Sequence, residues 1–172
     1  MDGRALGIRV AASYLFAYGA EMVPGAMAQL LGRPVRGARA VVRGFRLAFT
    51  AYSEEWEGGV ADLLADAEGE VEGVLYPLGP RDLLRIEVVE GWQDPRYGRI
   101  LLQAEREDGT RVDAVARAVR EKQPPVAPSP AYLDAMIQGG TAHGLSDGYL
   151  TWLLQLYPDP ATPPRAAWAE DE

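Results

Sequence analysis

The stretch "YLFAYGAEMVPG", residues 14–25, sets the start of the fold. Residues 13–18 are aromatic and apolar, which predicts a buried strand. The run stops at Gly19, and the apolar segment 21–32 predicts a short helix that ends at Gly32. A glycine between a strand and a helix can leave backbone N–H groups that point at a ligand. The pattern also fits an ordinary strand end, so the stretch alone leaves both readings open.

Further strands are predicted downstream of this stretch. Residues 37–50 alternate apolar and polar side chains, and the phase slips at Gly44, which predicts a bulged strand. Residues 56–66 and 70–78 predict two more strands around an acidic turn that contains glycine. The Gly58–Gly59 pair predicts a close approach by another part of the backbone. Sheet structure is therefore expected through the whole first half of the chain.

The second half of the chain begins with a hairpin signal. Residues 97–106 and 111–119 predict two strands joined by a turn at Asp108–Gly109. Residues 121–130, "EKQPPVAPSP", predict an extended, proline-dense linker that packs across the surface.

Helix signals occupy the remaining segments. Helices are predicted for residues 79–91, 130–140 and 145–157, and Ser129 followed by Pro130 is a good start for the second. About six strands and three or four short helices do not alternate regularly. This order predicts an α+β fold, a small mixed β-barrel flanked by short helices.

The length of 172 residues fits one domain. Residues 1–12 are expected to be a loose leader, residues 13–157 the domain, and residues 158–172 a disordered tail. The N-terminus lacks a basic region followed by an apolar block, so no secretory signal is expected. No apolar run reaches the length of a transmembrane helix. These features predict a cytoplasmic protein.

Composition narrows the possible chemistry. The net charge of −8 argues against nucleic acid or an anionic membrane as a partner. Cysteine is absent and His143 is the single histidine, which makes thiol chemistry, multi-histidine metal sites and a serine–histidine triad improbable. No metal and no cofactor is therefore expected. Carboxylates, tyrosines and backbone amides are left to carry any reaction.

Three side chains besides the glycine loop stand near breaks in the pattern. Glu90 lies beside Gly91 at a predicted helix end, and Tyr97 and Tyr132 each lie near a turn. Taken singly, a glutamate is most often a solvated surface charge, and a tyrosine is most often packed in the core. Their order along the chain carries more information than any one of them.

In this order the chain resembles the γ-glutamylcyclotransferase-like family, also called AIG2-like. The resemblance spans residues 14–155. It rests on "YGAEM" (18–22), "GFRLAF" (44–49), "WEGGVADL" (56–63), "VEGVLYPL" (71–78), "IEVVEGWQDPRY" (86–97), "PSPAYLDAMIQGG" (128–140) and "GLSDGYL" (144–150).

The resemblance implies an enzyme that cleaves a γ-glutamyl amide. The α-amine of the substrate attacks its own side-chain carbonyl, which gives 5-oxoproline and a free amine or amino acid. Glu90 would be the general acid/base. The substrate-binding residues implied are Tyr18, Gly19, Ala20, Glu21, Met22, Tyr97 and Tyr132. The expected partner is a small γ-glutamyl molecule, and the expected assembly is a monomer or homodimer.

The glycine loop departs from the family pattern at three positions. Ala20 replaces the usual serine, Glu21 the usual asparagine, and Met22 the usual leucine. Glu21 is the most consequential change, because it brings a negative charge near the expected place of the substrate carboxylate. A catalytically silent member, which binds a metabolite or a protein partner through the same pocket, is therefore the alternative.

Overall fold

The structure is a computed structural model that describes residues 14–88 and 94–158. The predicted leader, Glu90 and most of the predicted tail lie outside the described residues. Among the described residues, no helix combines the length and the apolar character that crossing a membrane requires.

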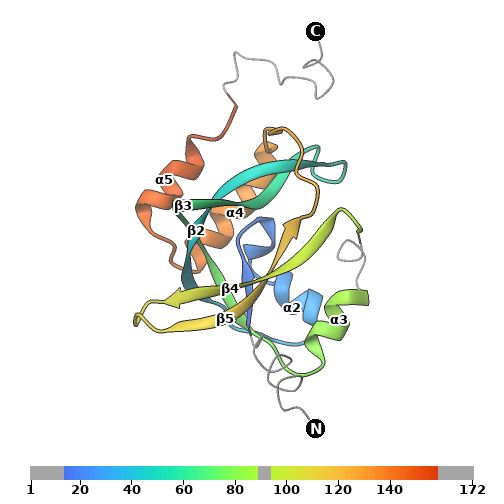
Figure 1. Cartoon of the computed structure of the whole chain (residues 1–172), viewed down its shortest axis with the longest axis vertical. Coiled ribbons are helices and arrows are strands. Elements are labelled where there is room, and N and C mark those ends of the chain that lie inside the picture. Colours follow the sequence, from blue (N-terminus) through green and yellow to red (C-terminus); the bar gives the residue numbers. More distant parts are fainter. Residues whose placement is uncertain (1–13, 89–93, 159–172) are drawn as a thin grey trace.

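A closed β-barrel forms the centre of the described chain, with neighbouring strands in the order β1-β3-β2-β4-β5 (Figure 1). The strands are β1 (Tyr14–Ala17), β2 (Ala38–Ser53), β3 (Gly58–Pro77), β4 (Tyr97–Arg106) and β5 (Arg111–Val119). All pairs are antiparallel except β1 with β5, which are parallel and meet at Leu15 and Val115. The barrel is therefore mixed, as the sequence predicts.

The long β2–β3 hairpin differs from the prediction of two strands for residues 56–66 and 70–78, because β3 is one continuous strand. β2 pairs on both sides of the acidic segment, with Arg43 opposite Glu70 and Phe45 opposite Ala65. The register shift at Gly44, whose φ is +88°, absorbs the extra residues of β3. The acidic segment is thus a bulge rather than a chain reversal, and the predicted bulge at Gly44 is confirmed.

Short helices flank the barrel. They are the 3₁₀ helix η1 (Ala20–Met22) and the α-helices α2 (Ala26–Leu31), α3 (Asp82–Val88), α4 (Pro130–Ala142) and α5 (Asp147–Leu154). In Figure 1, α4 and α5 lie on one side of the barrel, and α2 and α3 lie together on another. The predicted capping by Ser129 is confirmed, because its hydroxyl accepts the N–H of Tyr132 at 3.2 Å.

The predicted helix 21–32 is two shorter elements. Val23 and Pro24 separate η1 from α2, and Gly25 enters α2 with a left-handed φ of 87° that only glycine adopts easily. The predicted end at Gly32 is confirmed, since this residue closes α2 with φ 70°. The break between the two elements leaves residues 18–22 as a compact loop at the end of β1.

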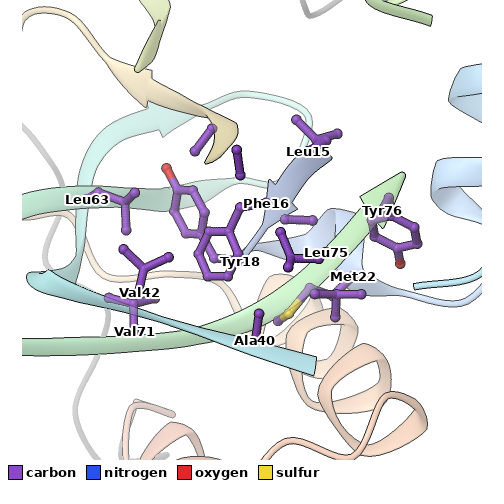
Figure 2. Packing of buried hydrophobic residues seen from close by; sticks show 14 of the residues in the cluster. Leu15, Phe16, Tyr18, Met22, Ala40, Val42, Leu63, Val71, Leu75 and Tyr76 are labelled. Atoms are coloured by element: carbon purple, nitrogen blue, oxygen red, sulfur yellow. The ribbon is translucent and has the colours of Figure 1, made fainter. Parts of the chain in front are cut away.

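The hydrophobic core fills the barrel around β1. Figure 2 shows Phe16 and Tyr18 among side chains of β2 and β3, with the labelled residues Val42, Leu63 and Val71 nearby. These five residues are all buried. The core therefore fixes the strand from which the glycine loop emerges.

The proline-dense linker packs on the end of the β2–β3 hairpin. The N–H of Gly59 donates to the carbonyl of Ala127 at 2.9 Å, and a Cβ at Gly59 would lie 2.0 Å from the carbonyl oxygen of Val126. The close approach predicted for Gly58–Gly59 is confirmed. This contact holds the linker, and with it the start of α4, against the hairpin.

Candidate active site

A cavity of about 980 Å³ opens beside the glycine loop. Its walls come from the loop and α2, the end of the β2–β3 hairpin, the start of β4, one residue of β5 and one of α4. They comprise Tyr18, Ala20, Glu21, Val23, Ala26, Gln29, Tyr52, Ser53, Glu54, Glu55, Trp56, Val60, Ala61, Asp94, Arg96, Tyr97, Arg117 and Tyr132. Segments distant in sequence therefore meet around one concave site.

Tyr132 is the buried contact between α4 and the loop. Its hydroxyl oxygen accepts the N–H of Ala61 at 3.0 Å and a backbone hydrogen bond from Ala20. The indole of Trp56 packs edge-on against its ring, with centroids 5.2 Å apart. Burial raises the pKa of Tyr132, and the carboxylate of Glu21 raises it further. Tyr132 therefore stays protonated at neutral pH.

Two glycines let α4 and the loop come this close. A Cβ at Gly19 would lie 2.4 Å from the hydroxyl oxygen of Tyr132, and one at Gly139 would lie 2.3 Å from the carbonyl of Met22. The side chain of Met22 is fully buried in the core and does not line the cavity. Gly19 and Met22 thus shape the loop from behind its cavity-facing side.

The carboxylate of Glu21 folds back over the start of its own loop. Oε1 lies 3.4 Å from the backbone nitrogens of both Tyr18 and Gly19, which are long hydrogen bonds. The side chain is half-buried and lines the cavity. In this structure, the backbone donors that the sequence offers to a ligand therefore face a side chain of the protein.

Tyr18 and Tyr97 line the part of the cavity next to β5. The hydroxyl of Tyr18 donates to the backbone carbonyl of Arg117. Burial raises the pKa of Tyr18, the Glu21 carboxylate raises it further, and the Arg117 guanidinium opposes this. Burial also raises the pKa of Tyr97, against the effect of Arg117 and of Arg96.

The sequence-predicted site residues fall into three groups. Those that line the cavity are Tyr18, Ala20, Glu21, Tyr97 and Tyr132. Gly19 and Met22 support the loop, and Glu90 lies outside the described residues. His143 is half-buried at the end of α4, where its Nδ1 lies 2.8 Å from the carbonyl oxygen of Gly139, and it does not line the cavity.

Sequence reasoning missed three charged cavity residues near β4 and on β5, namely Asp94, Arg96 and Arg117. Arg117 had a detectable signal, because it interrupts the run of alanine and valine in "DAVARAV" within a predicted barrel strand. A charge in such a strand needs a partner or a polar cavity, since burying it alone is costly. Asp94 and Arg96 precede β4 and carry no comparable signal.

Comparisons with known proteins agree with this architecture. A solved γ-glutamyl cyclotransferase superimposes with a TM-score of 0.76 at 21% identity, covering 90% of this chain and 93% of that one. An uncharacterised human protein gives the same TM-score and identity over 91% of this chain and 95% of its own. YkqA from Bacillus subtilis matches at 28% identity with a TM-score of 0.71. This match covers 89% of this chain but only 56% of YkqA.

The barrel with its flanking helices is the γ-glutamylcyclotransferase-like fold. The sequence model of the AIG2-like family matches residues 70–153, a segment that runs from β3 through α5. The resemblance of the chain to the AIG2-like family is thereby confirmed in sequence and in fold. No curated protein matches the chain in a sequence search.

Proposed function

We propose that the protein is a γ-glutamylcyclotransferase-type enzyme. It would cleave a γ-glutamyl amide by attack of the substrate's α-amine on its γ-carbonyl carbon. A C–N bond forms in the new ring, the amide C–N bond breaks, and the products are 5-oxoproline and a free amine or amino acid. The leaving nitrogen gains a proton and the attacking nitrogen loses one, so no water is consumed.

This proposal rests on one observation. Residues that the family resemblance assigns to substrate binding line a single cavity. Tyr18, Ala20 and Glu21 of the loop, Tyr97 of β4 and Tyr132 of α4 come from three separate segments and face one space of about 980 Å³. Cavities of this size accommodate small-molecule substrates. Asp94, four residues after Glu90 in the sequence, lines the same cavity.

Glu90 is proposed as the general acid/base because the resemblance assigns it this role. A free α-amine has a pKa of about 8, so at neutral pH it is mostly protonated and needs a base before it can attack. The same carboxyl would then return a proton to the leaving nitrogen. Since ring closure is intramolecular, much of the rate enhancement would come from holding the substrate in a folded, attack-ready shape.

A panel of γ-glutamyl dipeptides and γ-glutamyl amines tests the proposal, with 5-oxoproline release as the measurement. We expect turnover of at least one compound and a loss of roughly 100-fold or more in kcat for Glu90→Gln, the scale of a missing acid/base. Glu68→Gln is the matched control, because Glu68 is exposed on β3 and does not line the cavity. Absence of turnover, or equal turnover by Glu90→Gln, would refute the enzyme proposal.

One observation favours the alternative of a silent family member. The Glu21 carboxylate faces the N–H groups of Tyr18 and Gly19, at the place where the resemblance puts the bound glutamyl group. A silent member would bind a metabolite or a partner protein through the same cavity without releasing 5-oxoproline. The dipeptide panel therefore separates the two candidates.

A further inference from the structure

Two arginines line the cavity, and both approach the ring of Tyr97. The guanidinium carbon of Arg117 lies 3.8 Å from the ring centroid, and that of Arg96 lies 5.5 Å from it. Both belong to the wall formed by the start of β4 and by β5. Their other contacts suggest different tasks.

Arg96 is used to fix the backbone at the entrance to β4. Its Nε and Nη2 donate to the Asp94 carboxylate at 2.9–3.3 Å, and its Nη1 donates to the carbonyl of Tyr52 at 2.8 Å. The pKa of Asp94 is lowered, first of all by this hydrogen bonding. Arg96 therefore joins residues 94–97 to the end of β2, and its charge is offset by Asp94.

Arg117 projects from β5 and is half-buried. The strand is held next to β1 by the pairing of Leu15 with Val115, and the hydroxyl of Tyr18 donates to the backbone carbonyl of Arg117. The guanidinium lies against the face of the Tyr97 ring, and this contact restrains where it can lie. A planar guanidinium fork can bind a carboxylate through two parallel hydrogen bonds.

Glu21 and Arg117 bring opposite charges to the cavity, whose lining also holds the carboxylates of Glu54, Glu55 and Asp94. Both charged groups affect the pKa of the Tyr18 hydroxyl: the Glu21 carboxylate raises it, and the Arg117 guanidinium lowers it. The Glu21 carboxylate also lies close to the Tyr132 hydroxyl. A Cβ added at Gly19 would lie 2.9 Å from Glu21 Oε2 and 2.4 Å from the Tyr132 hydroxyl oxygen, so both groups border the same space. A substrate carboxylate placed against the loop would meet this like charge.

We propose that Arg117 binds the α-carboxylate of the γ-glutamyl substrate, while Glu21 faces its α-ammonium group. The inference rests on the proposed function and adds the residue that selects the glutamyl group. The α-carbon carries both charges, so a cavity with the two opposite charges fits this zwitterion in one orientation. Arg117 is then a specificity-determining residue on β5, and the glycine loop is not the carboxylate site.

Paired substrates with and without the α-carboxylate test the role of Arg117. A γ-glutamyl anilide and the matching 4-aminobutanoyl anilide have the same leaving group, and both can close a five-membered lactam. We expect the wild type to favour the γ-glutamyl compound in kcat/KM by roughly 10- to 100-fold, the range for hydrogen bonds to a charged group. Arg117→Gln should bring this ratio close to one, and Arg117→Lys should restore part of it.

Arg111→Gln is the matched control on the same strand, because Arg111 is exposed and does not line the cavity. It should leave the ratio at the wild-type value. Thermal melts of all variants would establish that each one is folded. A wild-type ratio in a folded Arg117→Gln protein would overturn the inference even if turnover confirms the enzyme.

A binding measurement separates this inference from the failure of catalysis. Calorimetric titration with 5-oxoproline and with 2-pyrrolidinone compares the same ring with and without a carboxylate. We expect tighter binding of 5-oxoproline by the wild type and no difference between the two ligands for Arg117→Gln. If this pattern appears without any turnover, the enzyme proposal is refuted and the carboxylate site stands. If 5-oxoproline binds no better than 2-pyrrolidinone to the wild type, the inference is overturned.

Discussion

Gly19→Ala tests whether the packing of Tyr132 against the loop determines the geometry of the site. Gly19 has φ −115° and ψ −148°, so its φ lies outside the left-handed region that favours glycine. The added methyl would lie 2.4 Å from the Tyr132 hydroxyl, and real Cβ contacts essentially never fall below 3.0 Å. The hydroxyl therefore has to move by at least 0.6 Å. The effect of the substitution is thus steric and local.

The cost follows from what that movement disturbs. Overpacking a well-filled site typically costs about 1–3 kcal/mol. For a chain of this length, each kcal/mol lowers the melting temperature by about 2–4 °C. Tyr132→Phe alone removes the acceptor for the part-buried N–H of Ala61, and a lost hydrogen bond of this kind costs about 1 kcal/mol. In the double variant, the methyl occupies the space that the hydroxyl vacates.

Urea unfolding of the two single variants and the double variant gives the measurement. We expect the double variant to be more stable than the sum of the single effects implies, by about 1 kcal/mol or more, because the two groups compete for one space. Gly148→Ala in α5 is the control, since nothing lies within 4 Å of its added methyl, and it should be neutral or slightly stabilising. Additive effects, or a Gly19→Ala protein as stable as the wild type, would refute the steric reasoning.

Two further predictions concern charges. Glu21→Gln should lower the pKa of Tyr76 from about 12, because the Glu21 carboxylate contributes to the shift. The pKa should stay above its ordinary value, because burial is the larger cause. Spectrophotometric titration of the tyrosines measures this change, and an unchanged titration curve would contradict the prediction. Arg33 hydrogen-bonds Asp82 and lowers its pKa, so the pair stabilises the fold above about pH 4 and this contribution is lost as the pH falls through the lowered pKa. Arg33→Gln should therefore be less stable than the wild type in urea at pH 7, with a gap that narrows below pH 4; a gap that does not change with pH would argue against the pair as its cause.

Local signals predicted the elements whose ends are fixed by turn and cap chemistry. The hairpin of β4 and β5 has the predicted bounds because Asp108–Gly109 determines the turn, with Gly109 at φ +86°. β3 was predicted as two strands because its acidic segment has the composition of a turn. Pairing with β2 continues on both sides of that segment, so a long-range contact overrides the local signal.

The residues of the site also divide into those that the sequence pattern indicates and those that long-range contacts bring to the cavity. The residues in the glycine loop and Tyr132 follow from motif order, whereas Arg117 reaches the cavity through the closure of the barrel between β1 and β5. That closure is a parallel contact between segments about 100 residues apart, for which the sequence has no local pattern. The family resemblance therefore pointed to the loop, Tyr97 and Tyr132, and missed Arg117, which only the closed barrel brings to the cavity.

Hydrogen bonds within the protein link the backbone of the glycine loop to Glu21, and these contacts bear on how Glu21 should be interpreted. The N–H groups of Tyr18 and Gly19 face Glu21, and Ala20 hydrogen-bonds Tyr132. A substrate that used these amides would have to displace a carboxylate already tethered to the loop. A substrate that binds through Arg117 would leave the Glu21 carboxylate in place and put its ammonium group beside it. The second arrangement turns the departure of Glu21 from the family pattern into a means of orienting the nucleophilic amine.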